Sequence, residues 1–293
     1  MAEDRPPTID PVAADRWQRR APAHSPWLHE EVGRRMEERL EWIRREPASW
    51  VDWEPVRGGL AAHARVAQRY ARSRCLVVEP HHEAAARAAL APSLWQRLRG
   101  DVTTFGDAPD GAAQMLWSNM RLHTSADPQQ LLARWHRALE ADGFLMFSCL
   151  GPDTLRELRA LYAALGWPPP SHEFTDMHDW GDMLVHTGFA EPVMDMERIT
   201  LTFETPARLV AELRELGANL HPQRFPALRG RAWRRTLEEA LGRDLRGAEG
   251  RLALTFEVIY GHALKPQPRV KVGEKSTFSV DDMRRMLQRP PQA

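Results

Sequence analysis

Glu79 stands where a carboxylate could do specific chemistry. It directly follows Cys75–Val78, an apolar run with the composition of a buried strand. In an open parallel sheet, ligands bind outside the carboxyl ends of the strands, and an acid there can accept hydrogen bonds from both hydroxyls of a ribose. We therefore interpret Glu79 as a candidate nucleoside-binding acid. The alternative is an ordinary charged residue at the end of a strand.

The same rule selects three further positions: Gly58–Gly59, Asp101 and Ser118–Asn119. Asp101, in the segment RGDVTTFGD, is interpreted as the acid after the third strand–helix unit, able to accept a hydrogen bond from an adenine amino group. The two glycines follow the run Trp50–Trp53, where a nucleoside needs the backbone to approach closely. Two glycines alone are a weak signal for such a site.

Motifs of several common enzyme classes are absent from the sequence. It contains no G-x-x-x-x-G-K, G-x-S-x-G or H-E-x-x-H, so phosphate-loop, hydrolase-elbow and zinc-protease interpretations lack their anchors. The histidine pair His81–His82 has no third ligand suggested nearby and is interpreted as part of a solvated loop, so no metal site is expected. Cys75 and Cys149 lie far apart in apolar runs and are expected to be buried, reduced thiols of a cytoplasmic protein.

The elements that would position these residues alternate between short apolar runs and amphipathic helices. Strands are expected at 50–53, 75–78, 115–117 and 144–149, and helices at 60–70, 83–90, 128–140 and 154–165. This alternation requires crossover connections, and hence a parallel sheet with helices on both faces. A helix at 180–187 and strands at 199–203 and 252–259 extend the pattern. The predicted fold class is therefore α/β.

The rest of the chain divides into an arm, an insert and a tail. Residues 1–26 show no hydrophobic period and are expected to form a flexible arm. A helix is expected from 27 to 45, ended by Pro47. The main domain should cover 27–264, with a helical insert at about 206–249, and residues 265–293 should form a mobile tail.

The charge balance limits the partners. The chain has 40 basic and 40 acidic side chains, whereas a broad nucleic-acid groove or an anionic membrane surface favours net positive charge. No apolar run approaches the length of a membrane span. The insert is locally basic, and its arginines either dock an acidic protein or form a solvated helix face; they are Arg224, Arg229, Arg231, Arg234 and Arg235.

Several segments of the second half resemble one family. They are SNMRLH (118–123), LARWHRALEADGFLMFSCLGPDTLRELR (132–159), FTDMHDWGDMLVHTGFAEPVMDMERITLTF (174–203), LVAELRELGAN (209–219) and FEVIYGHA (256–263). With them, the stretch 51–259 resembles the class I S-adenosylmethionine-dependent methyltransferases, and most closely the malonyl-acyl-carrier-protein O-methyltransferases of biotin synthesis. A related group comprises assembly factors that hydroxylate an arginine.

The resemblance implies a Rossmann-like fold with seven strands, one of them antiparallel, and S-adenosylmethionine over the carboxyl edge of the sheet. By position, Glu79 matches the family's ribose acid and Asp101 its adenine-side acid. Ser118–Asn119 match the segment beneath the reacting methyl group. An acyl carrier protein is the partner that the resemblance implies.

The first loop departs from the family pattern. The family has D-x-G-x-G-x-G, whereas this chain has Asp52 followed by WEPVRG, so that only Gly58 retains its glycine. Glu54 places a negative charge and Val56 a branched side chain where the family has glycine. These changes predict weakened binding at the donor's amino-acid end.

Two functions remain open on these observations. In the first, the protein methylates the free carboxylate of a malonyl thioester, which needs alignment and charge neutralisation but no general base. Candidates for holding that carboxylate are Arg156, Arg159 and His178, each with the alternative of a solvated surface residue. In the second, the chain is an inactive descendant of the fold that acts as a scaffold or assembly partner. A weaker third option is an enzyme altered to use another substrate.

Overall fold

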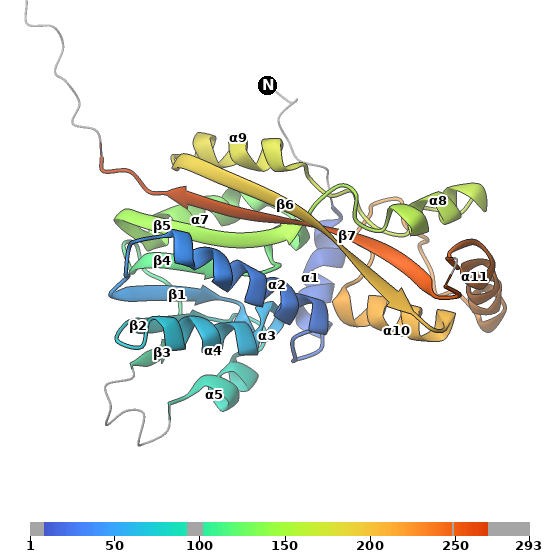
Figure 1. Cartoon of the computed structure of the whole chain (residues 1–293), viewed down its shortest axis with the longest axis horizontal. Helices are drawn as coiled ribbons and strands as arrows, with labels where there is room; N and C mark the ends of the chain where they lie inside the picture. Colours follow the sequence, from blue (N-terminus) through green and yellow to red (C-terminus); the bar gives the residue numbers. More distant parts are fainter. Residues whose placement is uncertain (1–8, 93–101, 248, 269–293) are drawn as a thin grey trace, which may run out of the picture.

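A seven-stranded sheet forms the centre of the computed structural model, which describes residues 9–92, 102–247 and 249–268 (Figure 1). Its strands are β1 (Ser49–Trp53), β2 (Arg74–Val78), β3 (Thr103–Phe105), β4 (Ala113–Ser118), β5 (Leu139–Leu150), β6 (Ala190–Phe203) and β7 (Leu252–Leu264). They lie in the order β3-β2-β1-β4-β5-β7-β6. The first five are parallel, and β7 runs antiparallel to both of its neighbours. The predicted mixed seven-stranded sheet is confirmed.

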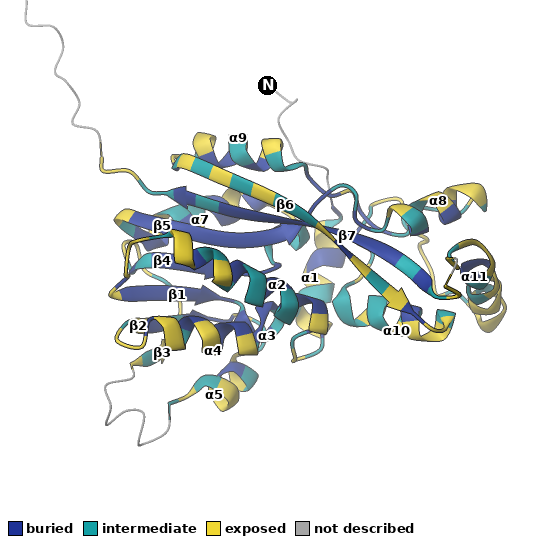
Figure 2. Ribbon diagram, viewed as in Figure 1, coloured by how far each residue is buried: buried dark blue, intermediate teal, exposed yellow. Residues whose placement is uncertain are grey.

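Helices cover both faces of this sheet. The helices are α1 (Pro11–Arg20), α2 (Trp27–Glu38), α3 (Pro55–Gly58), α4 (Leu60–Arg69), α5 (Glu83–Leu90), α7 (Pro128–Ala138), α8 (Arg156–Ala164), α9 (Met177–Thr187), α10 (Pro206–Leu216) and α11 (Arg231–Asp244), with 3-10 turns η1 (Arg39–Trp42) and η2 (Leu122–Thr124). One core cluster joins α2, α4 and α5 to the sheet, and a second joins α7 and α9. Because both faces are covered, the central strands are almost wholly buried (Figure 2).

The carboxyl ends of the parallel strands point toward one end of the molecule. There, α1, α10 and α11 lie beyond the arrowheads of the strands in Figure 1. Helices α10 and α11 form the predicted insert between β6 and β7. Strands β6 and β7 are longer than expected. They pair with each other along their whole length, from Ala190 to Phe203 on β6.

The arm is more regular than predicted. Residues 1–8 lie outside the described residues, but α1 follows them, a helix that the sequence analysis did not predict. Asp10 caps α1 by accepting hydrogen bonds from the backbone of Val12 and Ala13, and Pro11 occupies the first helical position. The buried face of α1 consists mainly of alanine, which gives too weak a hydrophobic period to detect in the sequence.

The chain remains bound to the sheet at the start of the expected tail. The backbone N–H of Lys265 donates to the carbonyl of Gly143 at 2.8 Å, and its ammonium group donates to the carbonyl of Leu139 at 2.6 Å. The rest of the expected tail, from 269 onward, lies outside the described residues. None of the helices in the described part of the chain is long and apolar enough to cross a membrane.

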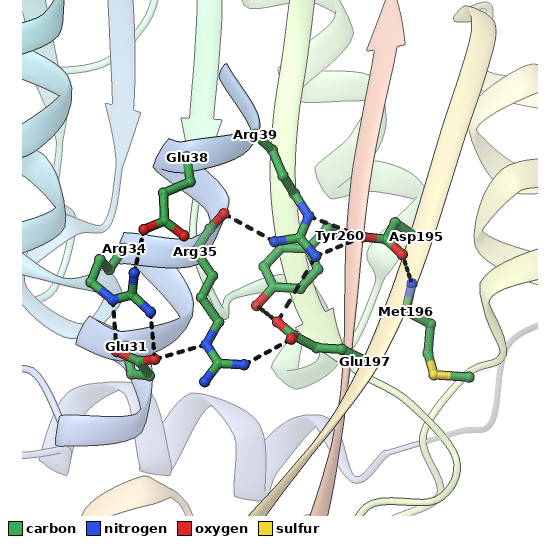
Figure 3. Close-up of polar contacts among 9 residues, drawn as sticks. All are labelled: Glu31, Arg34, Arg35, Glu38, Arg39, Asp195, Met196, Glu197 and Tyr260. Atoms are coloured by element: carbon green, nitrogen blue, oxygen red, sulfur yellow. Dashed lines mark hydrogen bonds and ion pairs between the residues drawn. The ribbon is translucent and has the colours of Figure 1, made fainter. Parts of the chain in front are cut away.

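Charged side chains fix α2 across β6 and β7 (Figure 3). Arg35 on α2 binds the carboxylate of Glu197 on β6 at 2.7 Å. One turn later, the guanidinium of Arg39 contacts Asp195 at 2.6 Å and lies 3.7 Å from the ring centroid of Tyr260. The Tyr260 hydroxyl donates to Glu197 at 2.5 Å. These contacts hold in place the helix that carries His29 to the carboxyl edge of the sheet.

Candidate functional site

Glu79 lies at the carboxyl end of β2, as the sequence predicts. One carboxylate oxygen accepts a hydrogen bond from the backbone N–H of Val56 at 3.1 Å, and the other accepts one from His82 at 3.3 Å. The residue is only 7% exposed. Burial, together with the nearby charge of Glu54, raises the pKa of Glu79 to about 7. A carboxylate with this low exposure, aimed at the first loop, is a candidate acceptor for ligand hydroxyls.

The first loop folds onto its own chain. Glu54 takes a left-handed conformation (φ 57°), and Pro55 then begins the one-turn helix α3, a position that proline favours. Val56 is fully buried. A Cβ on Gly58 would lie 3.1 Å from the carbonyl oxygen of Asn119, so the space next to this glycine is filled by the chain itself. The loop does not form the open glycine bend of the family pattern.

Glu54 and Arg121 form an ion pair beside α3. The distance from the Arg121 Nε to the Glu54 carboxylate is 2.8 Å, and both side chains are largely buried. The same guanidinium donates to the hydroxyl of Thr124 at 3.0 Å. The negative charge that the sequence places in the loop is therefore neutralised internally. Sequence reasoning missed Arg121, although it stands only two residues beyond Asn119 in SNMRLH.

Asn119 ties three elements together. Its side-chain N–H groups donate to the carbonyls of His29 on α2, at 2.7 Å, and of Gly58. Its side-chain oxygen accepts from the hydroxyl of Ser148 on β5 at 2.6 Å. The neighbouring Ser118 is buried, and its hydroxyl has no hydrogen-bond partner among the described residues. Asn119 thus positions the loop, and its amide is already occupied by the protein.

Asp52 is also used internally. Its carboxylate lies 2.7 Å from the Nδ1 of His63 on α4, and both side chains are buried. Burial raises the pKa of Asp52. The His63 ring in turn lies 5.2 Å, centroid to centroid, from the ring of Trp50. Asp52 therefore fixes α4 against β1, and the structure gives it no free face toward a ligand.

The acid beyond β3 differs from the one expected. Asp101 lies outside the described residues, and β3 begins two positions after it, at Thr103. The acid that follows β3 is Asp107, which is exposed. The short strand Thr103–Phe105 followed by Gly106 and Asp107 was the signal in the sequence for this residue.

The three side chains expected to hold a substrate carboxylate contact other parts of the protein. Arg156 is exposed and contacts Glu157 at 3.2 Å. Arg159 donates to the carbonyl of Pro152. His178 is exposed near the start of α9 and lies 2.6 Å from Asp176, the capping residue of that helix. None of the three lines either of the two cavities at the carboxyl edge of the sheet.

Two adjoining cavities lie at the carboxyl edge of the sheet. The larger, of about 260 Å³, is mostly apolar and lies between the strand ends and the insert helices. The smaller, of about 40 Å³, is more polar and lies beside Glu54, His82 and Arg121. The two share the lining residues Trp17, His29, Met120, His123, Thr124 and Leu216.

Helix α1 contributes to the walls of both cavities, and Arg57 holds the segment that follows it. Trp17 on α1 lines both of them. The Arg57 guanidinium donates to the carbonyl of His24, between α1 and α2, at 3.0 Å, and to the carbonyl of Glu215 on α10 at 2.6 Å. Burial lowers the pKa of Arg57 to about 10. One side chain from the first loop thus joins the arm to the insert.

Three histidines line the larger cavity: His29 and His172 are buried, and His123 is half-buried. No group of three or more His, Cys, Asp or Glu residues in the described ranges is arranged to hold a metal ion. Burial lowers the pKa of each of the three imidazoles, to about 3 for His29 and about 4 for His172. They are therefore neutral near pH 7.

Residues 57–147, from α3 into β5, match the model of a family described as a methyltransferase domain. The chain is 39% identical over 255 residues to a malonyl-acyl-carrier-protein O-methyltransferase of Gallionella capsiferriformans, covering 83% of this chain and 86% of that protein. It is 38% identical over 281 residues to the protein of the same name from Laribacter hongkongensis, covering 91% and 90%.

Among solved structures, the YcgJ protein of Bacillus subtilis superposes with a TM-score of 0.50. The match covers 80% of this chain and 98% of that one at 13% sequence identity. At that identity the likeness concerns the fold alone.

Proposed function

This chain belongs to the malonyl-acyl-carrier-protein O-methyltransferase family, and on that premise we propose that it transfers the methyl group of S-adenosylmethionine to the free carboxyl group of a malonyl-acyl-carrier-protein thioester in biotin precursor synthesis. The observation that supports the proposal most is the arrangement at one sheet edge. The Glu79 carboxylate accepts a hydrogen bond from the backbone of His82, which lines the smaller, more polar cavity, and the apolar cavity of about 260 Å³ adjoins that cavity. A nucleoside donor and an acyl substrate need such neighbouring environments.

Glu79 fits the ribose end of the donor. Its buried carboxylate lies at the carboxyl end of β2, and it would accept hydrogen bonds from the two ribose hydroxyls. We propose Asp107, rather than Asp101, as the acid on the adenine side, since it follows β3. When bound, S-adenosylmethionine supplies a methyl group on a positively charged sulfur, which a carboxylate oxygen can attack without a general base.

The amino-acid end of the donor has less room. Helix α3 and the ion pair between Glu54 and Arg121 fill this region, and the polar cavity is about 40 Å³, against roughly 300 Å³ or more for small-molecule pockets in general. Donor binding therefore requires α1 or α3 to move. The chain's own contribution to the reaction is to position the reactants and exclude water.

The substrate is proposed to be presented by an acidic carrier protein. Arg231 and Arg235 on α11 are exposed, and neither makes an ion pair within the described residues. Between α10 and α11, Leu228 is fully exposed. Trp233, which lies on α11 with these two arginines, lines the larger cavity. Exposed arginines and an exposed leucine near a cavity suit an acidic protein that delivers a tethered acyl chain. The two buried cysteines are consistent with the reducing cytoplasm as the compartment.

The test is methyl transfer from labelled S-adenosylmethionine to purified malonyl-acyl carrier protein, with calorimetric binding of S-adenosylhomocysteine. We expect transfer by the wild type and at least tenfold weaker donor binding by Glu79→Gln, which loses one charged acceptor. The double variant Glu54→Gly/Val56→Gly should bind the donor more tightly, since it removes bulk and charge from the loop. Glu83→Gln, an exposed residue on α5, is the matched control.

Two outcomes would contradict the proposal. If neither the folded wild type nor the loop variant transfers a methyl group, the activity is excluded. If the wild type binds no donor while the loop variant does, the protein is a scaffold with a decayed donor site, which is the alternative function that the first loop suggests.

A further inference from the structure

The wall of the apolar cavity contains a polar corner without internal partners. Ser171 and His172, in the segment between α8 and α9, both line this cavity and are more than nine-tenths buried. The Ser171 hydroxyl and the Nδ1 of His172 have no hydrogen-bond partner in the described part of the chain. A buried polar group without a hydrogen-bond partner is unfavourable, so two neighbouring ones in the wall of the same cavity indicate a ligand site.

The contact of His172 defines what this corner offers. The Nε2 of His172 lies 3.0 Å from the carbonyl oxygen of His123. Since a carbonyl can only accept, Nε2 carries the hydrogen and donates. Burial lowers the pKa of His172 to about 4, so the ring is neutral and Nδ1 bears a lone pair. The corner therefore presents one acceptor at His172 and one group at Ser171 that can donate or accept.

The other two histidines extend this pattern along the cavity. The Nδ1 of His123 accepts from the backbone N–H of Leu150 at 3.3 Å, so its Nε2 carries the hydrogen. The Nδ1 of His29 lies 2.7 Å from the carbonyl oxygen of Arg57 and donates to it, which leaves a lone pair on Nε2. Neither Nε2 makes a hydrogen bond within the described residues. The cavity thus offers both donors and acceptors, and its histidines carry no charge.

This combination selects one class of ligand. A carboxylate or phosphate would meet the lone pairs of His29 and His172 without a buried cation to balance it, because Arg214, the one arginine lining the cavity, is exposed. A plain hydrocarbon chain would leave all the polar atoms unpaired. An uncharged chain with amide groups supplies an N–H donor and a carbonyl acceptor together, and its methylene groups suit the apolar walls.

We propose that the Ser171–His172 corner binds the amide groups of the pantetheine arm that carries the acyl substrate. This inference rests on the proposed function and adds to it the residues that recognise the tether. The charged malonyl end would then lie toward the neighbouring cavity, which is the more polar of the two. The corner would distinguish an amide-bearing thioester from a simple alkyl thioester.

The test compares two substrates on the full-length protein: malonyl-pantetheine and the malonyl thioester of ethanethiol, which has no amide. We expect the wild type to favour malonyl-pantetheine in kcat/KM by tenfold or more. In Ser171→Ala and in His172→Phe this ratio should fall by about tenfold, mainly through KM for malonyl-pantetheine. The control is His186→Phe, an exposed histidine on α9, which should keep the wild-type ratio.

The outcomes separate this inference from the proposed function. Equal losses on both substrates in both variants would show a structural role and overturn the inference, as would an unchanged ratio. If the wild type methylates neither substrate, the proposed function fails, and calorimetric binding of pantetheine itself decides the inference. Binding that weakens at least tenfold in Ser171→Ala supports it, and absence of binding to the wild type overturns it.

Discussion

The Glu79 carboxyl group is subject to opposing requirements for folding and for binding. Acceptance of two ligand hydroxyls requires the ionised form, whereas burial near Glu54 favours the protonated form and raises the pKa to about 7. The folded protein therefore binds this proton more tightly than the unfolded chain does. The stabilisation from Glu79 is fully present below its ordinary pKa of 4.5 and is lost as the pH rises through about 7.

We predict that Glu79→Gln stabilises the protein at pH 8 but changes its stability little at pH 5. The neutral amide avoids burying a charge, and the shift in pKa corresponds to about 3 kcal/mol at the higher pH. Thermal unfolding of wild type and variant across this pH range measures the effect. Glu83→Gln, on the exposed face of α5, serves as the control. A difference between Glu79→Gln and wild type that does not vary with pH would contradict the prediction.

At the residue scale, the sequence locates side chains that follow a recognisable strand. Glu79 and Ser118–Asn119 were found in this way, because a short apolar run marks where a strand ends. It could not show that Asp52 and Asn119 are occupied by partners distant in sequence, such as His63 and the His29 carbonyl. Ser171 and His172 lie in an irregular, proline-rich segment, where no period reveals which side chains face inward.

At the scale of elements, the charged contacts of α2 are expected to contribute unequally to the free energy of unfolding. Arg39 joins the end of this helix to Asp195 and to the face of Tyr260, across β6 and β7 (Figure 3). Arg34 lies on the same helix, but its ion pairs are with Glu31 and Glu38, also on α2. Only the first of these arginines connects the helix to the strands.

We predict that Arg39→Ala lowers the free energy of unfolding by about 1–2 kcal/mol, because it removes both an ion pair and a cation–π contact. Arg34→Ala should cost less than about 0.5 kcal/mol, the usual value of a pair within one helix. Urea unfolding of both variants measures the two values. The Arg39→Ala loss should shrink at high salt. Equal losses of unfolding free energy in both variants would contradict the prediction that the contacts of Arg39 with Asp195 and Tyr260 stabilise the protein more than ion pairs within α2.

The element pattern was readable where strands and helices alternate, and less so at the arm. The central strands β1, β4 and β5 are largely buried on both faces, which gives mostly apolar runs of strand length. Helix α1 was missed because alanine forms its buried face, although Asp10 followed by Pro11 is a recognisable helix start. Strand β3, which precedes Asp107, was not predicted because it has only three residues, too few for a clear period.

At the scale of the whole molecule, a net charge of zero conceals an uneven distribution. The exposed arginines Arg231 and Arg235 lie on α11, at the end of the molecule that bears the cavities (Figure 1). Exposed Arg65 on α4 and Arg72 after it also make no ion pair within the described residues. Helix α4 lies left of centre in Figure 1, away from α11 at the right. Reversing the charges of Arg231 and Arg235, and separately those of Arg65 and Arg72, therefore distinguishes docking at α11 from a general effect of net charge.

We predict that Arg231→Glu/Arg235→Glu weakens binding of malonyl-acyl carrier protein at least tenfold at low salt, mainly by slowing association. The equivalent reversal Arg65→Glu/Arg72→Glu changes the net charge equally and should alter binding less than threefold. Surface plasmon resonance at two salt concentrations measures both. Equal effects of the two reversals would contradict docking at α11.

The hydrogen bonds that Arg57 makes to the carbonyls of His24 and Glu215 bear on how ligands enter and leave the two cavities. Trp17 belongs to the wall of both cavities, and the same guanidinium fastens its helix to the insert. A displacement of α1 would therefore change the walls of both cavities at once. Movement of this one helix would thus couple the release of a molecule from one cavity to the exposure of a molecule in the other.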